Sequence, residues 1–232
     1  TLRNSSAASD VYKRQARHSQ NTITKQVDLS LPELALTMNR FYLFKDKDIF
    51  GKGGVGVSLS ANAKNNISSP DSLLFTQQTL EKMQNGITVN MPMSLSYKIL
   101  KYFTLTPAAN ISGKMYFETI TKSYDSDLNT IIKDTVKGVK TAADYNFSTR
   151  LNTLMYGNYY FKSKRLKQIR HVLTPAISAS YKPDFSKDKY GYYDQVQSDS
   201  LGNIQTYSIF ENGVYGGPSA GESGLILSLI HI

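Results

Sequence analysis

The stretch "GITVNMPMSLSYKI", residues 86–99, alternates between apolar and polar side chains with a period of two. Its apolar members share one parity and are Ile87, Val89, Met91, Met93, Leu95 and Tyr97. The residues between them are Thr88, Asn90, Pro92, Ser94, Ser96 and Lys98. Successive side chains of a strand point to opposite faces, so this pattern predicts a strand with one apolar face and one polar face.

The same alternation recurs along the chain, most clearly over residues 55–64, 103–117 and 147–161. Polar breaks rich in Gly, Asp and Lys separate these stretches, among them "KSYDSDLNTIIKDTVKG" at residues 122–138. Such breaks are typical of turns between strands. The sequence therefore predicts an antiparallel meander, with one short helix within the connection at residues 71–86.

Strand length separates a membrane barrel from a soluble sandwich. Sandwich strands commonly run about 5–6 residues, whereas the three longest alternations here cover residues 87–99, 103–117 and 147–161. At ~3.3 Å per residue and a tilt of ~45°, such strands project to about 30–35 Å, which matches the hydrocarbon core of a bilayer. We therefore predict an all-β fold, a fragment of an antiparallel transmembrane β-barrel forming an open arc of roughly 8–10 long strands.

Each face of the predicted sheet has its own candidate residues. The candidates for contact with lipid are apolar and are Val57, Leu59, Val89, Met91, Met93, Leu95, Leu105, Ile111, Leu151 and Met155. The candidates for the lumen are polar and are Asn90, Ser94, Ser96, Lys98, Asn110, Ser112, Lys114, Arg150 and Asn152.

Four aromatic residues form a candidate girdle at the two membrane interfaces, namely Phe103, Phe117, Phe147 and Phe161. Two of them bracket each of two predicted strands with the same separation, as barrels with aromatic belts do. The alternative is that Phe and Tyr are simply common in strands.

Both ends of the chain match a sequencing adapter. Back-translation of "SSAASDVYKRQ", residues 5–15, gives an adapter followed by its transposase mosaic end, and "LSLIHI", residues 227–232, gives the reverse complement of that end. We therefore expect residues 1–15 and 227–232 to be adapter-derived tails, and residues 16–226 to be a metagenomic fragment of a barrel domain.

Composition and motifs give no support to an enzyme or to a cofactor. The chain has no Cys and only three His, which leaves no disulfide scaffold and no Cys nucleophile. "GKGGVG", residues 51–56, precedes a predicted strand, whereas a nucleotide cradle precedes a helix. "DSDLN", residues 125–129, opens like a calcium loop, but Thr130 stands where that loop needs Gly. We predict no catalytic residue, no metal site and no cofactor.

The net charge of +9 is compatible with nucleic acid, anionic lipid or simple solubility. The most basic run is "KSKRLKQIRH", residues 162–171, and no recognisable nucleic-acid module surrounds it. A solvated turn or a contact with anionic headgroups explains this run better, so we predict no nucleic-acid partner.

Four collinear blocks resemble a known family. They are "SQNTITKQVDLSLPELALTMNRFYLFK" (residues 19–45), "MQNGITVNMPMSLSYKILKYFTLTPAANIS" (83–112), "IRHVLTPAISASYKPDF" (169–185) and "SIFENGVYGGPSAGESG" (208–224). Together they are similar to the barrel region of LptD (OstA-like), the lipopolysaccharide-assembly protein of the outer membrane, in its Bacteroidota form.

The resemblance implies a non-enzymatic translocon in the outer membrane of a Gram-negative bacterium that inserts lipopolysaccharide into the outer leaflet. Its implied partners are lipopolysaccharide, outer-membrane lipid, an LptE-like plug lipoprotein and the periplasmic bridge proteins. Three alternatives remain open at this point: a porin or nutrient-uptake barrel, a secreted glycan-binding β-sandwich, and an outer-membrane esterase or protease barrel.

Overall fold

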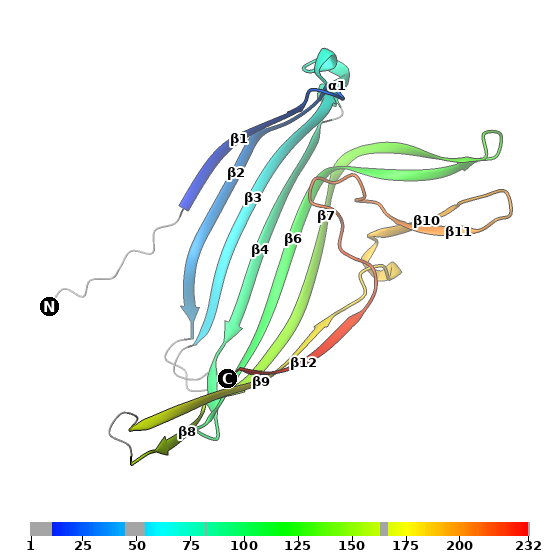
Figure 1. The fold of residues 1–232 in the computed structure, drawn as a ribbon. Coiled ribbons are helices and arrows are strands. Elements are labelled where there is room, and N and C mark those ends of the chain that lie inside the picture. The colour runs from blue at the N-terminus through cyan, green and yellow to red at the C-terminus, as the bar shows by residue number, and fades with distance from the viewer. Residues whose placement is uncertain (1–10, 45–53, 82, 163–166, 232) are drawn as a thin grey trace.

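The computed structural model describes residues 11–44, 54–81, 83–162 and 167–231. Most of these residues form one antiparallel sheet of ten strands, in the order β1-β2-β3-β4-β6-β7-β9-β12, with β5 paired to β6 and β8 paired to β9 (Figure 1). Its strands are β1 (Val11–Asn21), β2 (Gln26–Leu43), β3 (Val55–Pro70), β4 (Gln84–Leu95), β5 (Tyr97–Ile99), β6 (Phe103–Asp125), β7 (Thr130–Thr153), β8 (Met155–Tyr160), β9 (Gln168–Lys182) and β12 (Ser223–His231).

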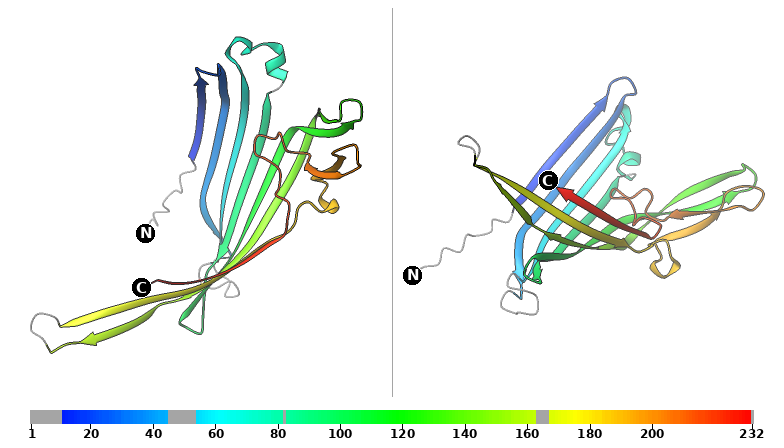
Figure 2. Two further views of the ribbon diagram at one scale, coloured as in Figure 1. Left: turned by 45° about the vertical axis from the view of Figure 1, so that its right-hand side comes forward. Right: turned by 60° about the horizontal axis from the view of Figure 1, so that its bottom comes forward.

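This architecture confirms the predicted fold class. The sheet is an open, curved and twisted meander, and its eight main strands stand side by side in their order along the chain (Figures 1 and 2). The longest strands, β6 and β7, have 23 and 24 residues. The predicted short helix is also present, because the β3–β4 connection contains the 3-10 turn η2 (Asp71–Leu73) and the helix α1 (Gln77–Glu81).

Two details of the predicted strands were wrong. Residues 122–138 are not a loop, because β6 and β7 run through them and turn only at residues 126–129, which makes a hairpin that projects from the sheet (Figure 1). The alternation over residues 147–161 is not one strand either, because β7 ends at Thr153 and β8 pairs with β9 alone. The strands at residues 122–138 were missed because charged residues lie on both faces of this hairpin. The interruption at Leu154 was missed because the alternation continues through it.

The predicted tails lie partly in described strands. Residues 11–15 pair with β2, and residues 227–231 pair with β9. Strand pairing does not bear on the origin of the coding sequence, so the adapter origin of both tails stays a prediction.

A long excursion separates β9 from β12. Residues 183–222 contain the 3-10 turn η3 (Asp188–Tyr190) and a two-stranded sheet of β10 (Tyr193–Gln197) and β11 (Ile204–Ser208). They return across the sheet before β12 begins, and Figure 2 shows this segment beside β6 and β7. The five largest fully buried side chains of the described residues all belong to the excursion or to β6 beneath it, and they are Tyr116, Phe185, Phe210, Ile120 and Pro218.

Candidate functional site

The strand register places eight of the nine predicted lumen residues on one face of the sheet, and the ninth, Ser96, lies between β4 and β5. Asn90 of β4 lies opposite Ser60 of β3 and Ser112 of β6, and Ser112 lies opposite Asp144 of β7. The other rows of this polar face follow the same parity, with Ser94 opposite Gly56, Thr104 opposite Asn152, and Thr106 opposite Arg150. Residues directly opposite each other share a face, so the polar side of the alternation forms a continuous surface.

The ten predicted lipid-facing residues share the opposite face. Met91 lies opposite Ile111, which lies opposite Tyr145, and Leu105 lies opposite Leu151. Their accessibility differs, because Met155 is 55% exposed whereas Val57 is only 3% exposed. Val57 lies between Phe41 of β2 and Met93 of β4 in the register, so neighbouring side chains leave little of it for a lipid chain. Contact of this face with lipid stays a prediction.

The four residues of the candidate girdle occupy unequal levels of the sheet. Phe103 opens β6 and Phe161 follows β8, but Phe147 lies opposite Ala109 in the middle of the sheet, since β7 begins at Thr130. Phe117 lies at a register irregularity between β6 and β7. All four rings are exposed, and their place at the membrane interfaces stays a prediction.

Arg40 is a polar-face cation that the alternation did not reveal. Its guanidinium donates a hydrogen bond to the Ser94 hydroxyl two strands away, and it occupies the space that a side chain at Gly56 would fill. The signal was a glycine in β3 that leaves room for the side chain of an arginine from β2, at a register irregularity between Met38 and Phe41. That signal can be read only when the register is known.

A strap of the excursion, residues 208–222, crosses the polar face. It reaches β3 through the Tyr215 hydroxyl, which donates to the Asn62 carbonyl at 3.2 Å. On β6, the Gly216 carbonyl accepts hydrogen bonds from the Tyr116 hydroxyl and from Lys114 Nζ, the latter at 3.3 Å. Three strands, β3, β4 and β6, therefore lie beneath this segment, which we call the strap.

Lys114 has two roles in this arrangement. Besides its bond to the strap, its Nζ lies 3.3 Å from a carboxylate oxygen of Asp144 on β7. Its side chain is largely covered, and the neighbouring Ser112 is buried. Among the predicted lumen residues, Lys98, Arg150 and Ser96 are instead exposed. The strap therefore covers one end of the polar face and leaves the other end open.

Aromatic rings hold the strap and the excursion against the sheet. Tyr116 stacks on Phe210 with ring centroids 4.5 Å apart, and the contacts continue from ring to ring through Tyr192, Tyr190 and Phe185 to Tyr145 on β7. The Tyr192 hydroxyl also accepts a hydrogen bond from the Ala143 amide of β7 at 2.9 Å. This cluster covers the part of β7 that continues beyond its pairing with β9.

Asp184 closes the base of the excursion. Its carboxylate accepts hydrogen bonds from the Ser186 hydroxyl at 2.6 Å, from the Ser186 amide at 2.9 Å and from the Gly221 amide at 2.8 Å. These bonds favour the charged form, the Ser186 hydroxyl most strongly, and lower the pKa of Asp184 to about 2. The hydrogen bond between Asp184 and Gly221 joins the two ends of the excursion.

Glycine at position 213 lets the strap approach β6. A Cβ added there would collide with the Tyr116 ring. Gly213→Ala is therefore expected to lift the strap and to speed its cleavage in limited proteolysis of the folded protein. Gly113→Ala is the matched control, because a Cβ at Gly113 meets nothing within 4 Å. Equal cleavage of both variants would contradict this packing.

Within the ranges that the structure describes, no helix is long and apolar enough to cross a membrane. The same residues contain no group of three or more His, Asp or Glu side chains placed to hold a metal ion. The start of the calcium-like "DSDLN" is a turn, in which the Asp125 carboxylate accepts hydrogen bonds from the Asp127 and Leu128 amides. Part of "GKGGVG", residues 51–53, lies outside the described residues.

A single long antiparallel sheet with one apolar face and one polar face is the architecture of a β-barrel wall. A family model described as "LptD protein" matches residues 6–230, so the chain belongs to the LptD family. Its role therefore lies in lipopolysaccharide transport and assembly, and members of this family are outer-membrane proteins of Gram-negative bacteria. No curated protein and no solved structure matches the chain. The family resemblance read from the sequence is confirmed, while the Bacteroidota origin stays a prediction.

Proposed function

We propose that this chain forms part of the wall of a non-enzymatic translocon that inserts lipopolysaccharide into the outer leaflet of the outer membrane. In this role the apolar face contacts lipid, and the polar face lines the route of the sugar and phosphate groups. The observation that carries the proposal is the separation of the two residue sets, because the predicted lumen residues that lie in strands share one face and the predicted lipid-facing residues share the other.

The proposed partners follow from the family. Lipopolysaccharide is the transported molecule, an LptE-like lipoprotein fills the lumen of the complete barrel, and the periplasmic bridge proteins deliver the lipid. A soluble glycan-binding sandwich is disfavoured, because it needs a second layer on the apolar face. The second sheet of the described part, β10–β11, has only two strands and packs near Ile120. Ile120 shares the polar face with Tyr116, so this small sheet does not form a second layer on the apolar face.

Charge reversal on the open part of the polar face tests the proposal. The double variant Lys98→Glu/Arg150→Glu is expected to lower the arrival of newly made lipopolysaccharide at the cell surface several-fold, because carboxylates repel its phosphate groups. The measurement is pulse-labelled lipopolysaccharide accessible at the surface of cells that depend on the variant. Lys114 is left unchanged, because its substitution would also break contacts with Asp144 and the strap.

The matched control is Lys98→Gln/Arg150→Gln, which removes the cations without adding repulsion and is expected to have the smaller effect. Normal surface lipopolysaccharide in the charge-reversed variant, at an unchanged protein level, would contradict the proposal. Altered solute uptake with normal lipopolysaccharide would favour the porin alternative.

A further inference from the structure

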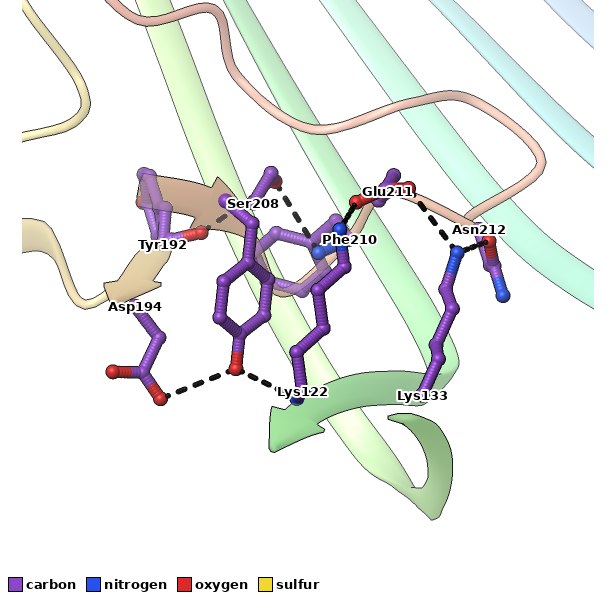
Figure 3. A network of polar contacts seen from close by, with 9 residues as sticks. Lys122, Lys133, Tyr192, Asp194, Ser208, Phe210, Glu211 and Asn212 are labelled. Atoms are coloured by element: carbon purple, nitrogen blue, oxygen red, sulfur yellow. Dashed lines mark hydrogen bonds and ion pairs between the residues drawn. The ribbon is translucent and has the colours of Figure 1, made fainter. Parts of the chain in front are cut away.

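The strap is held to the β6–β7 hairpin by one carboxylate between two lysines. Glu211 Oε2 lies 2.5 Å from Lys122 Nζ of β6, and Glu211 Oε1 lies 3.1 Å from Lys133 Nζ of β7 (Figure 3). Lys133 Nζ also donates to the Asn212 side-chain oxygen at 2.7 Å. Two cations from different strands thus converge on one anion of the strap.

The surroundings keep Lys122 in place even without the carboxylate. Its backbone amide donates to the Tyr207 hydroxyl at 3.0 Å, and its Nζ lies 5.0 Å from the centre of the Tyr207 ring. Its side chain is only 14% exposed, whereas the side chains of Lys133 and Glu211 are 34% and 44% exposed. The site is therefore built around Lys122 and is open to solvent on the side of Lys133 and Glu211.

The neighbours of Glu211 stabilise its charged form. The hydrogen bond from Lys122 is the largest effect and the bond from Lys133 adds to it, so the pKa of Glu211 is lowered. The carboxylate is therefore ionised at neutral pH and is the anion that the two lysines bind in this structure. A phosphoryl group carries more negative charge and three acceptor oxygens, so it suits the same lysines at least as well.

We propose that Lys122 and Lys133 form an anion-binding site for a phosphoryl group, and that Glu211 fills this site while the strap lies on the sheet. An incoming phosphoryl group displaces Glu211 and loosens the strap, which uncovers the polar face beneath it. The inference rests on the proposed function for the source of the anion, since a lipid that passes along this face would carry the phosphoryl group. Free phosphate has the same chemistry and is the other source.

Hydrogen–deuterium exchange of the full-length protein in detergent tests the inference, with the peptides that cover residues 208–222 as the readout. Pyrophosphate is expected to speed their exchange about fivefold relative to sodium chloride of equal ionic strength, as the loss of ion pairs worth ~1 kcal/mol predicts. Glu211→Gln is expected to give the faster exchange without pyrophosphate. Lys122→Ala/Lys133→Ala is expected to exchange fast and to lose the response.

Lys137→Ala is the matched control, because it removes an exposed lysine of the same hairpin and is expected to keep the response. A phosphorylated diglucosamine lipid in micelles, compared with its dephosphorylated form, separates the two sources. A response to the phosphorylated lipid at lower phosphate concentration than pyrophosphate identifies the headgroup, and an equal response identifies the free anion.

An exchange rate that pyrophosphate leaves unchanged in the parent protein would overturn the inference, and so would a full response in the double-lysine variant. These readouts need no transport, so the two proposals fail separately. If pyrophosphate does not change strap exchange but charge reversal on the polar face lowers lipopolysaccharide delivery, only the anion site is contradicted. If pyrophosphate speeds strap exchange but the charge-reversed variant delivers lipopolysaccharide normally, only the transport proposal is contradicted.

Discussion

Replacing Met91 by lysine is expected to remove most of the folded protein from the outer membrane. Met91 lies in β4 on the apolar face, opposite Ile111 of β6. A lysine at the midplane of the lipid face of a barrel costs about 2–4 kcal/mol, which is a large share of the stability of a folded domain. The measurement is the amount of heat-modifiable, membrane-inserted protein, together with the urea midpoint of unfolding from bilayers.

Asn90→Lys is the control for this variant, because Asn90 is the preceding residue of the same strand and lies on the polar face opposite Ser112. The same charge at the same depth is expected to be tolerated there, since water or polar groups solvate it. Two variants that insert equally well would show that the two faces do not differ in environment, and would contradict the assignment of the apolar face to lipid.

Replacing Phe210 by alanine is expected to have the second largest effect, on the strap alone. The Phe210 side chain is 1% exposed, stacks on Tyr116 and packs in a cluster with Ala142. Truncation of a buried aromatic ring costs about 3–5 kcal/mol, and we expect the strap to detach locally while the strands stay paired. Limited proteolysis of the folded protein should then cleave within residues 208–222, with the sheet intact by circular dichroism.

Leu201→Ala is the control for Phe210→Ala. Leu201 belongs to the same excursion but is 87% exposed in the turn between β10 and β11, so its truncation is expected to leave the strap in place. Resistance of the Phe210→Ala strap to cleavage would contradict the packing described here. Global unfolding of that variant would contradict the local character of the strap.

The two faces of the sheet could be predicted from the sequence because they depend on local alternation. Met91 and Asn90 were assigned to opposite faces by parity alone, and the register places them so. The same logic failed for residues 122–138, where charged side chains lie on both sides of the hairpin and no apolar face marks the strands. Alternation reveals a strand only when its two faces meet different environments.

The strap could not be predicted, because its contacts join residues that are far apart in the chain. The hydrogen bond from Tyr116 to Gly216 spans 100 residues, and the one from Tyr215 to Asn62 spans 153. "SIFENGVYGGPSAGE" has no period, and its glycines read as a plain loop. No sequence signal connects Glu211 to Lys122 or Lys133 either, because these ion pairs depend on where the strap lies relative to the distant β6–β7 hairpin.

Fluorescence quenching by brominated acyl chains tests the central claim most directly. A fluorescent amino acid is introduced at Ile111, on the apolar face, or at the adjacent Asn110, on the polar face opposite Asn146. The full-length protein is then reconstituted into bilayers of brominated phosphatidylcholine. Strong quenching at position 111 and little at position 110 is the predicted result. Equal quenching at both positions, or a protein that stays folded in water with position 111 shielded, would contradict the account.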